Sequence, residues 1–131
     1  MTRITKSEVR KALKKSTTEL YMELGYNWVD NYSNQTGIKF HIRSENILAK
    51  GKNIFRYRKK ILFNLICKKF HWCKNGKKFR KFTNPIAYGV LISQLISESI
   101  PEWLSASVLF SLLIKTSGDL DKFCKCKSRN N

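Results

Sequence analysis

The sequence predicts a mainly α-helical protein: a single small domain of four to five helices that ends in a helical hairpin, with room for one short β-hairpin. Three observations lead to this fold class. Apolar residues recur at close to helical spacing over several segments, helix-capping residues precede them, and one short segment alternates as a strand does. At 131 residues, 42% of them hydrophobic, the chain can build one modest core but not two ordinary domains.

The first helix is expected to begin at Thr5 or Ser7, because either side chain can cap it. Hydroxyl residues at positions 16–18 weaken the helix in its middle. Gly25 is expected to end it, or to be followed by a second short helix over residues 27–32. The apolar positions that define this helical pattern are Val9, Leu13, Leu20, Leu24 and Trp28.

Residues 38–43 alternate strictly, with Ile38, Phe40 and Ile42 on one side and polar residues on the other. This pattern predicts a strand. A strand needs a partner, and residues 77–82, after the Asn75-Gly76 turn, are the candidate.

Residues 53–73 are expected to form the next helix, with an apolar stripe toward the core and a cationic side toward solvent. Asn84 and Pro85 then suit the start of a helix that runs to about Ser97 or Glu98. Residues 99–102 match a capping box in which Ser99 caps and Glu102 bonds back. The last helix is therefore expected over residues 100–115.

The chain divides by composition into three parts: a basic helical part at residues 1–82, an apolar helical hairpin at 83–116 and a flexible tail at 117–131. The tail offers little to bury and is expected to fray. The last helix is apolar on most faces, so residues 85–115 are expected to contact a second copy or a protein partner. Their uninterrupted apolar runs are too short to span a membrane.

Charge is the strongest pointer to function. The net charge is +17, and residues 1–82 hold twenty-one basic and five acidic residues. Residues 50–81 hold thirteen lysines and arginines, no acidic residue and six interleaved aromatic residues. Phosphate backbones attract such a surface by counterion release, and exposed aromatic rings can stack on unpaired bases.

We therefore expect a non-catalytic nucleic-acid-binding protein, for RNA or DNA. The side chains expected to bind nucleic acid are Lys50, Lys52, Arg56, Arg58, Lys59, Lys60, Lys68, Lys69, Trp72, Lys74, Lys77, Lys78, Arg80 and Lys81. Among the aromatic residues of this segment, Trp72, Tyr57 and Phe79 are expected at the surface, whereas Phe55, Phe63 and Phe70 are expected in the core. No zinc-finger, basic-zipper or ribonucleoprotein motif specifies the nucleic acid further.

Two other classes of function remain open. A peripheral or membrane-active protein would place the same basic residues on anionic headgroups. An adaptor or inhibitor would place them on an acidic protein. No cofactor motif is legible, and His41 and His71 have no companions that would indicate catalysis.

The four cysteines are expected to be free thiols in a cytoplasmic protein, because residues 1–15 are polar and basic and contain no secretory signal. Cys67, His71 and Cys73 lie close in sequence, so a zinc site completed by Cys124 or Cys126 is conceivable. The spacing is not a standard ligand pattern. We therefore favour Cys67 as an inert core thiol and expect no metal.

Overall fold

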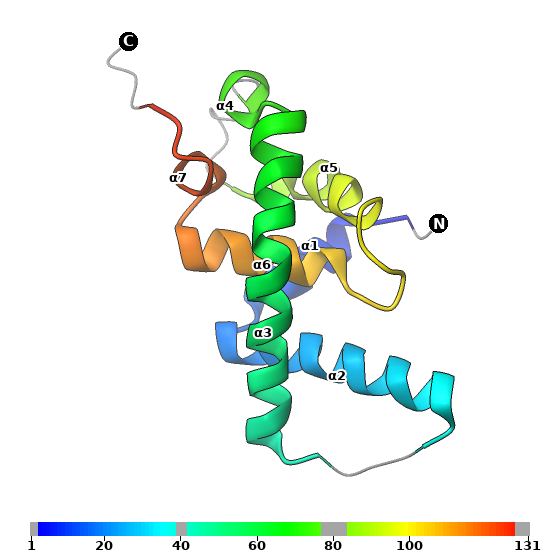
Figure 1. The fold of residues 1–131 in the computed structure, drawn as a ribbon. Coiled ribbons are helices and arrows are strands. Elements are labelled where there is room, and N and C mark those ends of the chain that lie inside the picture. Colours follow the sequence, from blue (N-terminus) through cyan, green and yellow to red (C-terminus); the bar gives the residue numbers. More distant parts are fainter. Residues whose placement is uncertain (1–2, 39–41, 77–83, 128–131) are drawn as a thin grey trace.

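A computed structural model describes residues 3–38, 42–76 and 84–127. Every regular element in these ranges is a helix, which confirms the mainly α-helical fold class (Figure 1). Residues 39–41 of the expected strand and all of its expected partner, residues 77–82, lie outside the described residues, so the β-hairpin stays a prediction. None of the helices in the described ranges has the length and apolar character needed to cross a membrane.

The hydroxyl residues near position 16 start a new helix rather than weaken a long one. Helix α1 (Lys6–Lys14) begins at Thr5 as expected, and the Thr5 side chain accepts a hydrogen bond from the Glu8 backbone N–H. Helix α2 (Thr17–Thr36) begins at a capping box between Ser16 and Glu19. Each of these two residues satisfies a backbone N–H of the other, which fixes the break between the helices.

Gly25 lies inside α2, so the expectation that it ends a helix is wrong. Its role is to let α2 approach helix α3 (Ser44–Phe63) closely. A methyl group on Gly25 would lie 2.2 Å from the Ile47 carbonyl oxygen, and one on Gly51 would lie 1.7 Å from the Tyr21 carbonyl oxygen. Gly37 ends α2 instead, with a φ of 73° in the left-handed region.

Helix α3 begins at Ser44, earlier than the expected start at residue 53. Its first half buries Ile47 and Gly51 against α2, so packing supports helix where the local apolar pattern is weak. After Phe63 the helix continues as a π-helical segment, η1 (Asn64–Lys69), before the short helix α4 (Trp72–Asn75). The expected helix over residues 53–73 is therefore confirmed in its middle and extended at its start.

Helix α5 (Ile86–Ser97) starts and ends where the sequence predicts, and the Asn84 side chain accepts a hydrogen bond from the Ile86 N–H over 3.0 Å. The expected start of the next helix at Ser99 is wrong, because the Ser99 hydroxyl donates back to the Ile96 carbonyl of α5. Helix α6 (Ala106–Ser117) is capped by Ser105.

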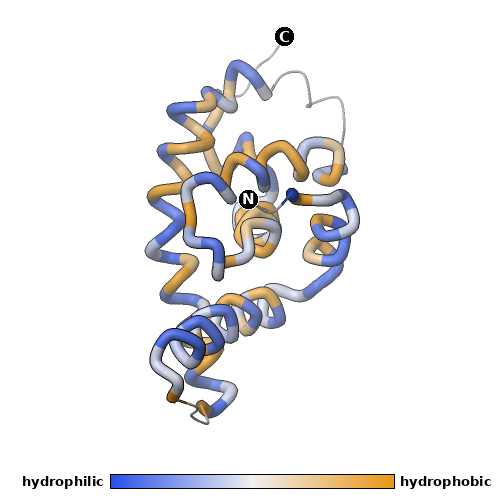
Figure 2. Tube along the Cα trace, turned by 90° about the vertical axis from the view of Figure 1, so that its right-hand side faces the viewer, coloured by the Kyte–Doolittle hydropathy of each residue, from blue (hydrophilic) through white to orange (hydrophobic). Residues whose placement is uncertain are grey.

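Helix α6 is the centre of the fold, and residues 106–114 are buried along their whole length. Helices α1, α2, α5 and α7 pack against it, with α3 crossing in front (Figure 1). Turned by 90°, the strongly hydrophobic central helix is seen nearly end-on with the other helices around it (Figure 2). The apolar faces of α6 are thus covered by the chain itself.

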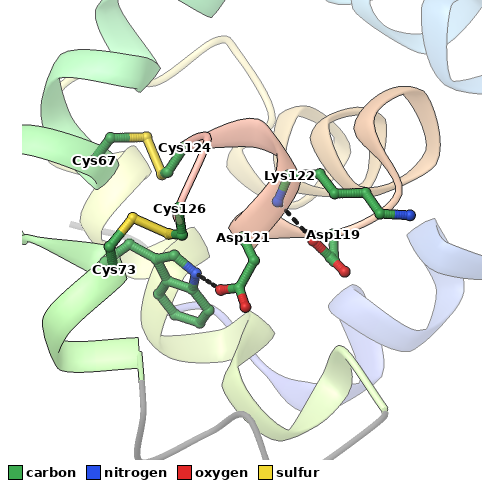
Figure 3. The surroundings of a disulfide bond; sticks show 8 residues. Cys67, Cys73, Asp119, Asp121, Lys122, Cys124 and Cys126 are labelled. Carbon is green, nitrogen blue, oxygen red and sulfur yellow. Dashed lines mark hydrogen bonds between the residues drawn. A yellow bond between two sulfur atoms is a disulfide. The ribbon is translucent and has the colours of Figure 1, made fainter. Parts of the chain in front are cut away.

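The C-terminal segment is packed where fraying was expected. Helix α7 (Leu120–Phe123) begins at Asp119, whose side chain accepts a hydrogen bond from the Lys122 N–H, and Leu120 is fully buried. Two disulfides, Cys67–Cys124 and Cys73–Cys126, join this segment to η1 and α4 (Figure 3). The prediction that the four cysteines are free thiols, with Cys67 an inert thiol in the core, is therefore wrong.

Candidate nucleic-acid interface

An exposed cationic stripe runs along α3. Lys52, Arg56 and Lys60 recur at four-residue intervals and Lys59 lies three residues after Arg56, so these cations share one side of the helix, next to the side that carries the buried Phe55 and Leu62. All four side chains are exposed. We call these four residues the α3 stripe.

Aromatic rings lie beside several of the expected binding cations. The Lys50 ammonium lies 4.2 Å from the centre of the Trp28 ring of α2, and the Lys52 ammonium lies 6.0 Å from that of Tyr21. The Arg58 guanidinium lies 5.4 Å from the neighbouring Tyr57 ring. Cation–π contacts at such distances hold the charges in place without neutralising them. Lys50 and Arg58 are half-buried, whereas Lys52 is exposed.

The cationic surface continues beyond α3. Lys68 and Lys69 of η1 and Lys74 of α4 are exposed. Lys77, Lys78, Arg80 and Lys81, which the sequence also nominates, lie outside the described residues.

Trp72 does not reach the surface, which corrects its expected place in the interface. The side chain is 2% exposed, and its indole N–H donates to Asp121 Oδ1 over 2.7 Å (Figure 3). The ring centres of Trp72 and Tyr88 lie 5.2 Å apart. Trp72 therefore belongs to the core between α4, α5 and α7.

The other aromatic residues of the segment are mostly placed as expected. Tyr57 is 69% exposed and Phe55 is buried. Phe63 and Phe70 are half-buried rather than fully in the core, and Phe79 lies outside the described residues. Tyr57 is therefore the exposed aromatic side chain of α3 that could stack on a base.

Carboxylates do not neutralise these cations within the described residues. The two ion pairs found there are Lys15–Glu23 and Arg43–Glu45, neither of which involves a residue of the α3 stripe. Asp119 caps α7, and Asp121 accepts the Trp72 hydrogen bond. The positive charge of the α3 stripe therefore remains available to an anionic ligand.

Other carboxylates gather elsewhere. Glu8, Glu98 and Glu102 line a separate cavity of about 470 Å³ at the connection between α5 and α6. Figure 1 shows this connection on the side of the molecule away from α7. These three carboxylates make no ion pair with the α3 stripe.

A cationic groove lies between α3, η1 and the C-terminal segment, with a volume of about 710 Å³. Arg56, Lys59, Lys60 and Lys68 line one wall, and Lys122 and Lys125 line the other. Sequence reasoning missed the two C-terminal lysines because it assigned residues 117–131 to a flexible tail. The closely spaced Cys124 and Cys126 were the available signal, since pairing with Cys67 and Cys73 brings the tail to η1.

The same region contains the cysteines that the sequence suggests as possible zinc ligands. The four cysteine sulfurs form disulfides and so are not available as thiolate ligands for the zinc site considered from the sequence. No group of three or more potential ligands is found among the described residues. Burial, together with the negative charges of Asp119 and Asp121, raises the pKa of Tyr88 from 10.0 to about 12.

In comparisons with known proteins, the chain matches no protein-family model, no curated protein and no solved structure.

Proposed function

We propose that this chain is a non-catalytic nucleic-acid-binding protein that holds the phosphate backbone on the cationic surface of α3 and η1. The observation that supports the proposal most directly is the α3 stripe, a row of exposed cations without a carboxylate partner among the described residues. Both RNA and DNA carry the backbone chemistry that this surface fits, so the proposal covers both.

The physical driving force is release of counterions from the phosphates. Log K for duplex DNA falls by roughly 0.9 per neutralised phosphate for each tenfold rise in salt, and by about 0.7 for single strands. Four phosphate contacts from the α3 stripe would therefore give a slope of about 3 to 4. The exposed ring of Tyr57 adds a place for a base to stack.

The oxidised chain is the form that we propose binds. Disulfides persist in oxidising compartments and are rare in a reducing cytoplasm, so Cys67–Cys124 and Cys73–Cys126 weigh against the cytoplasmic location suggested by the sequence. A cytoplasmic location would require the four cysteines to be reduced in the cell. Alkylation of cell extracts under acid quench, followed by mass measurement, separates the two: oxidised cysteines resist labelling until reductant is added.

Contact with a second copy or a protein partner through residues 85–115 is proposed only for the outward face of α5. Leu91 is 40% exposed there, whereas α6 is buried inside the chain. The same burial disfavours a membrane-active role, because the apolar helices that would insert into lipid already form the core.

The test is a binding titration with a variant in which three of the four cations of the α3 stripe are reversed in charge. Labelled RNA and DNA oligonucleotides are titrated by fluorescence anisotropy against the wild type and the Arg56→Glu, Lys59→Glu, Lys60→Glu variant over a range of salt. The matched control is Arg10→Glu, Lys11→Glu, Lys14→Glu, which makes the same charge change at exposed positions of α1. Circular dichroism establishes that both variants are folded.

We expect the α3 variant to lose binding and the α1 variant to keep most of it. Equal loss in both would show that net charge alone attracts nucleic acid and would reject the α3 surface as the site. Failure of the wild type to bind RNA and DNA at low salt would reject the proposed function. In that case, binding to vesicles containing phosphatidylserine would favour the peripheral-membrane alternative, and a stoichiometric complex with an acidic protein would favour the adaptor alternative.

A further inference from the structure

The cationic groove differs from the rest of the basic surface because it is positive on two facing sides. Arg56, Lys59, Lys60 and Lys68 come from the middle of the chain, and Lys122 and Lys125 come from its C-terminal segment. Among the described residues, no acidic side chain lines the groove. Like charges on the two walls repel each other, and an anion bound between them would offset this repulsion.

The C-terminal wall is fixed in place by covalent bonds and by packing. Cys124 is bonded to Cys67 of η1 and Cys126 to Cys73 of α4, so Lys125 lies between two anchored residues. Its backbone has a φ of 55°, a left-handed conformation that is uncommon for lysine. Phe123 packs edge-on against Phe63 with ring centres 5.7 Å apart, which holds α7 beside α3.

We infer that this groove binds a single-stranded segment of nucleic acid between its two walls, and that the disulfides are needed for the second wall. The inference rests on the proposed function and deepens it, since it names the form of nucleic acid and the residues that select it. Lys122 and Lys125 are assigned as phosphate-contacting residues alongside Arg56, Lys59 and Lys60.

The shape and lining of the groove favour a single strand over a duplex. A volume of about 710 Å³ lies within the ~300–1,000 Å³ range of sites that enclose small ligands, which is the scale of a few nucleotides and not of a rod-like double helix. The half-buried side chain of Phe63 also lines the groove, and the buried Phe123, 6% exposed, packs behind it. Cationic walls combined with an accessible aromatic ring are the usual construction of sites for single strands, whose unpaired bases can stack.

The first test removes the charge of the C-terminal wall and leaves both disulfides intact. Lys122→Gln, Lys125→Gln is compared with Lys11→Gln, Lys14→Gln, an equal loss of charge on α1. Each protein is titrated, under non-reducing conditions, with a labelled single-stranded oligonucleotide and with the duplex formed by annealing its complement. All four positions are exposed, so both variants are expected to fold.

For the single strand, the C-terminal variant should lower affinity about tenfold at low salt and reduce the salt slope by about 0.7 for each phosphate that the protein no longer neutralises. In the α1 control, the affinity and the salt slope for the single strand should change by only a small fraction of these amounts. The wild type should bind the duplex more weakly than the single strand. The C-terminal variant should bind the duplex nearly as tightly as the wild type does. Equal effects of the two variants on the single strand, or a duplex that binds as tightly as the single strand, would overturn the inference.

The second test breaks the link between the tail and η1. Wild type is titrated with the single strand before and after reduction by a phosphine, with far-ultraviolet circular dichroism recorded on the same samples. A reduced protein that keeps its helices should bind with the affinity and salt slope of Lys122→Gln, Lys125→Gln. Unchanged binding by a folded, reduced protein would overturn the role of the disulfides.

If reduction unfolds the protein, Cys73→Ser, Cys126→Ser, which retains Cys67–Cys124, is used instead. It leaves Lys125 anchored on one side only, and it should bind with an affinity between those of the wild type and the C-terminal variant. If this variant binds with the affinity of the wild type, the proposed need for the disulfides in binding is wrong. Failure of the groove inference remains distinguishable from failure of the proposed function, because the latter requires the oxidised wild type to bind no nucleic acid.

Discussion

Trp72 is a buried hydrogen-bond donor, and its removal should therefore affect stability rather than binding. Trp72→Phe keeps an aromatic ring but deletes the indole N–H that donates to Asp121. Loss of this hydrogen bond to the half-buried Asp121 carboxylate should lower the free energy of unfolding by about 1–3 kcal/mol, measured in urea. Affinity for nucleic acid should stay unchanged, and a selective loss of affinity would return Trp72 to the interface.

Ser111 offers a change in the opposite direction. Its side chain is fully buried on α6, and its hydroxyl has no hydrogen-bond partner among the described residues. Because an unpartnered buried hydroxyl is costly, Ser111→Ala should raise the free energy of unfolding by about 1 kcal/mol. Thermal unfolding checks this, and a destabilised variant would show that the hydroxyl contributes through packing or a bound water.

Single side chains were predictable where the local pattern decides their surroundings. The helical periodicity of residues 53–73 puts Phe55 inside and leaves Tyr57 outside, and both expectations are confirmed. Trp72 was misplaced because its partner, Asp121, lies 49 residues away in sequence. No local pattern signals that contact.

The crossing of α2 and α3 depends on two glycines. In Gly51→Ala the added methyl group would meet the Tyr21 carbonyl at 1.7 Å, so the two helices must move apart. We expect a loss of several kcal/mol, beyond the ~1–3 kcal/mol that overpacking usually costs. Gly37→Ala is the control: its added methyl meets nothing within 4 Å, and only the left-handed backbone at φ 73° is strained.

Chemical denaturation compares these two glycine variants. Gly37→Ala should cost about 1–2 kcal/mol from backbone strain alone. If Gly51→Ala costs no more than Gly37→Ala, the close crossing of α2 and α3 is not a tight constraint on the fold.

The start of α6 can be tested with two serines. Ser105 caps α6 by accepting from the Val108 N–H, so Ser105→Ala should lower stability by about 1 kcal/mol. Ser99 caps no helix and donates to the Ile96 carbonyl at the exposed end of α5, so Ser99→Ala should cost less. The reverse order in thermal unfolding would support a last helix that begins at residue 100.

Helix ends were predictable from sequence when a capping residue acts locally. Thr5 and Asn84 both lie at the starts of the helices that the sequence predicts for them. The starts of α3 and α6 were not predictable in this way. Packing of Ile47 and Gly51 on α2 extends α3 toward the N-terminus, and Ser99 resembles a cap but bonds back to α5.

The two disulfides connect distant parts of the chain, so their loss should weaken the whole fold. Each closes a long loop, with sequence separations of 57 and 53 residues. Removing either one, as Cys67→Ser, Cys124→Ser or as Cys73→Ser, Cys126→Ser, should lower the free energy of unfolding by about 2–4 kcal/mol. Equal stability of the oxidised and reduced wild type in urea would contradict this.

The mainly α-helical class followed from composition and periodicity, but the groove did not. Four cysteines allow three pairings, and the sequence alone does not select among them. The cations of α3 were identified from their clustering, whereas Lys122 and Lys125 join them only through the folded position of residues 119–127.

The same pair of cross-links has a consequence for proteolysis. Each disulfide joins a residue at or before Cys73 to one at or after Cys124, so both enclose the whole stretch between these two cysteines. This stretch includes the exposed side chains of Lys74 and Lys115. A protease that nicks the backbone once anywhere in this stretch leaves two fragments that remain one covalent molecule. Protein nicked there by trypsin would therefore run as a single band on a gel without reductant and separate into pieces when thiol is added.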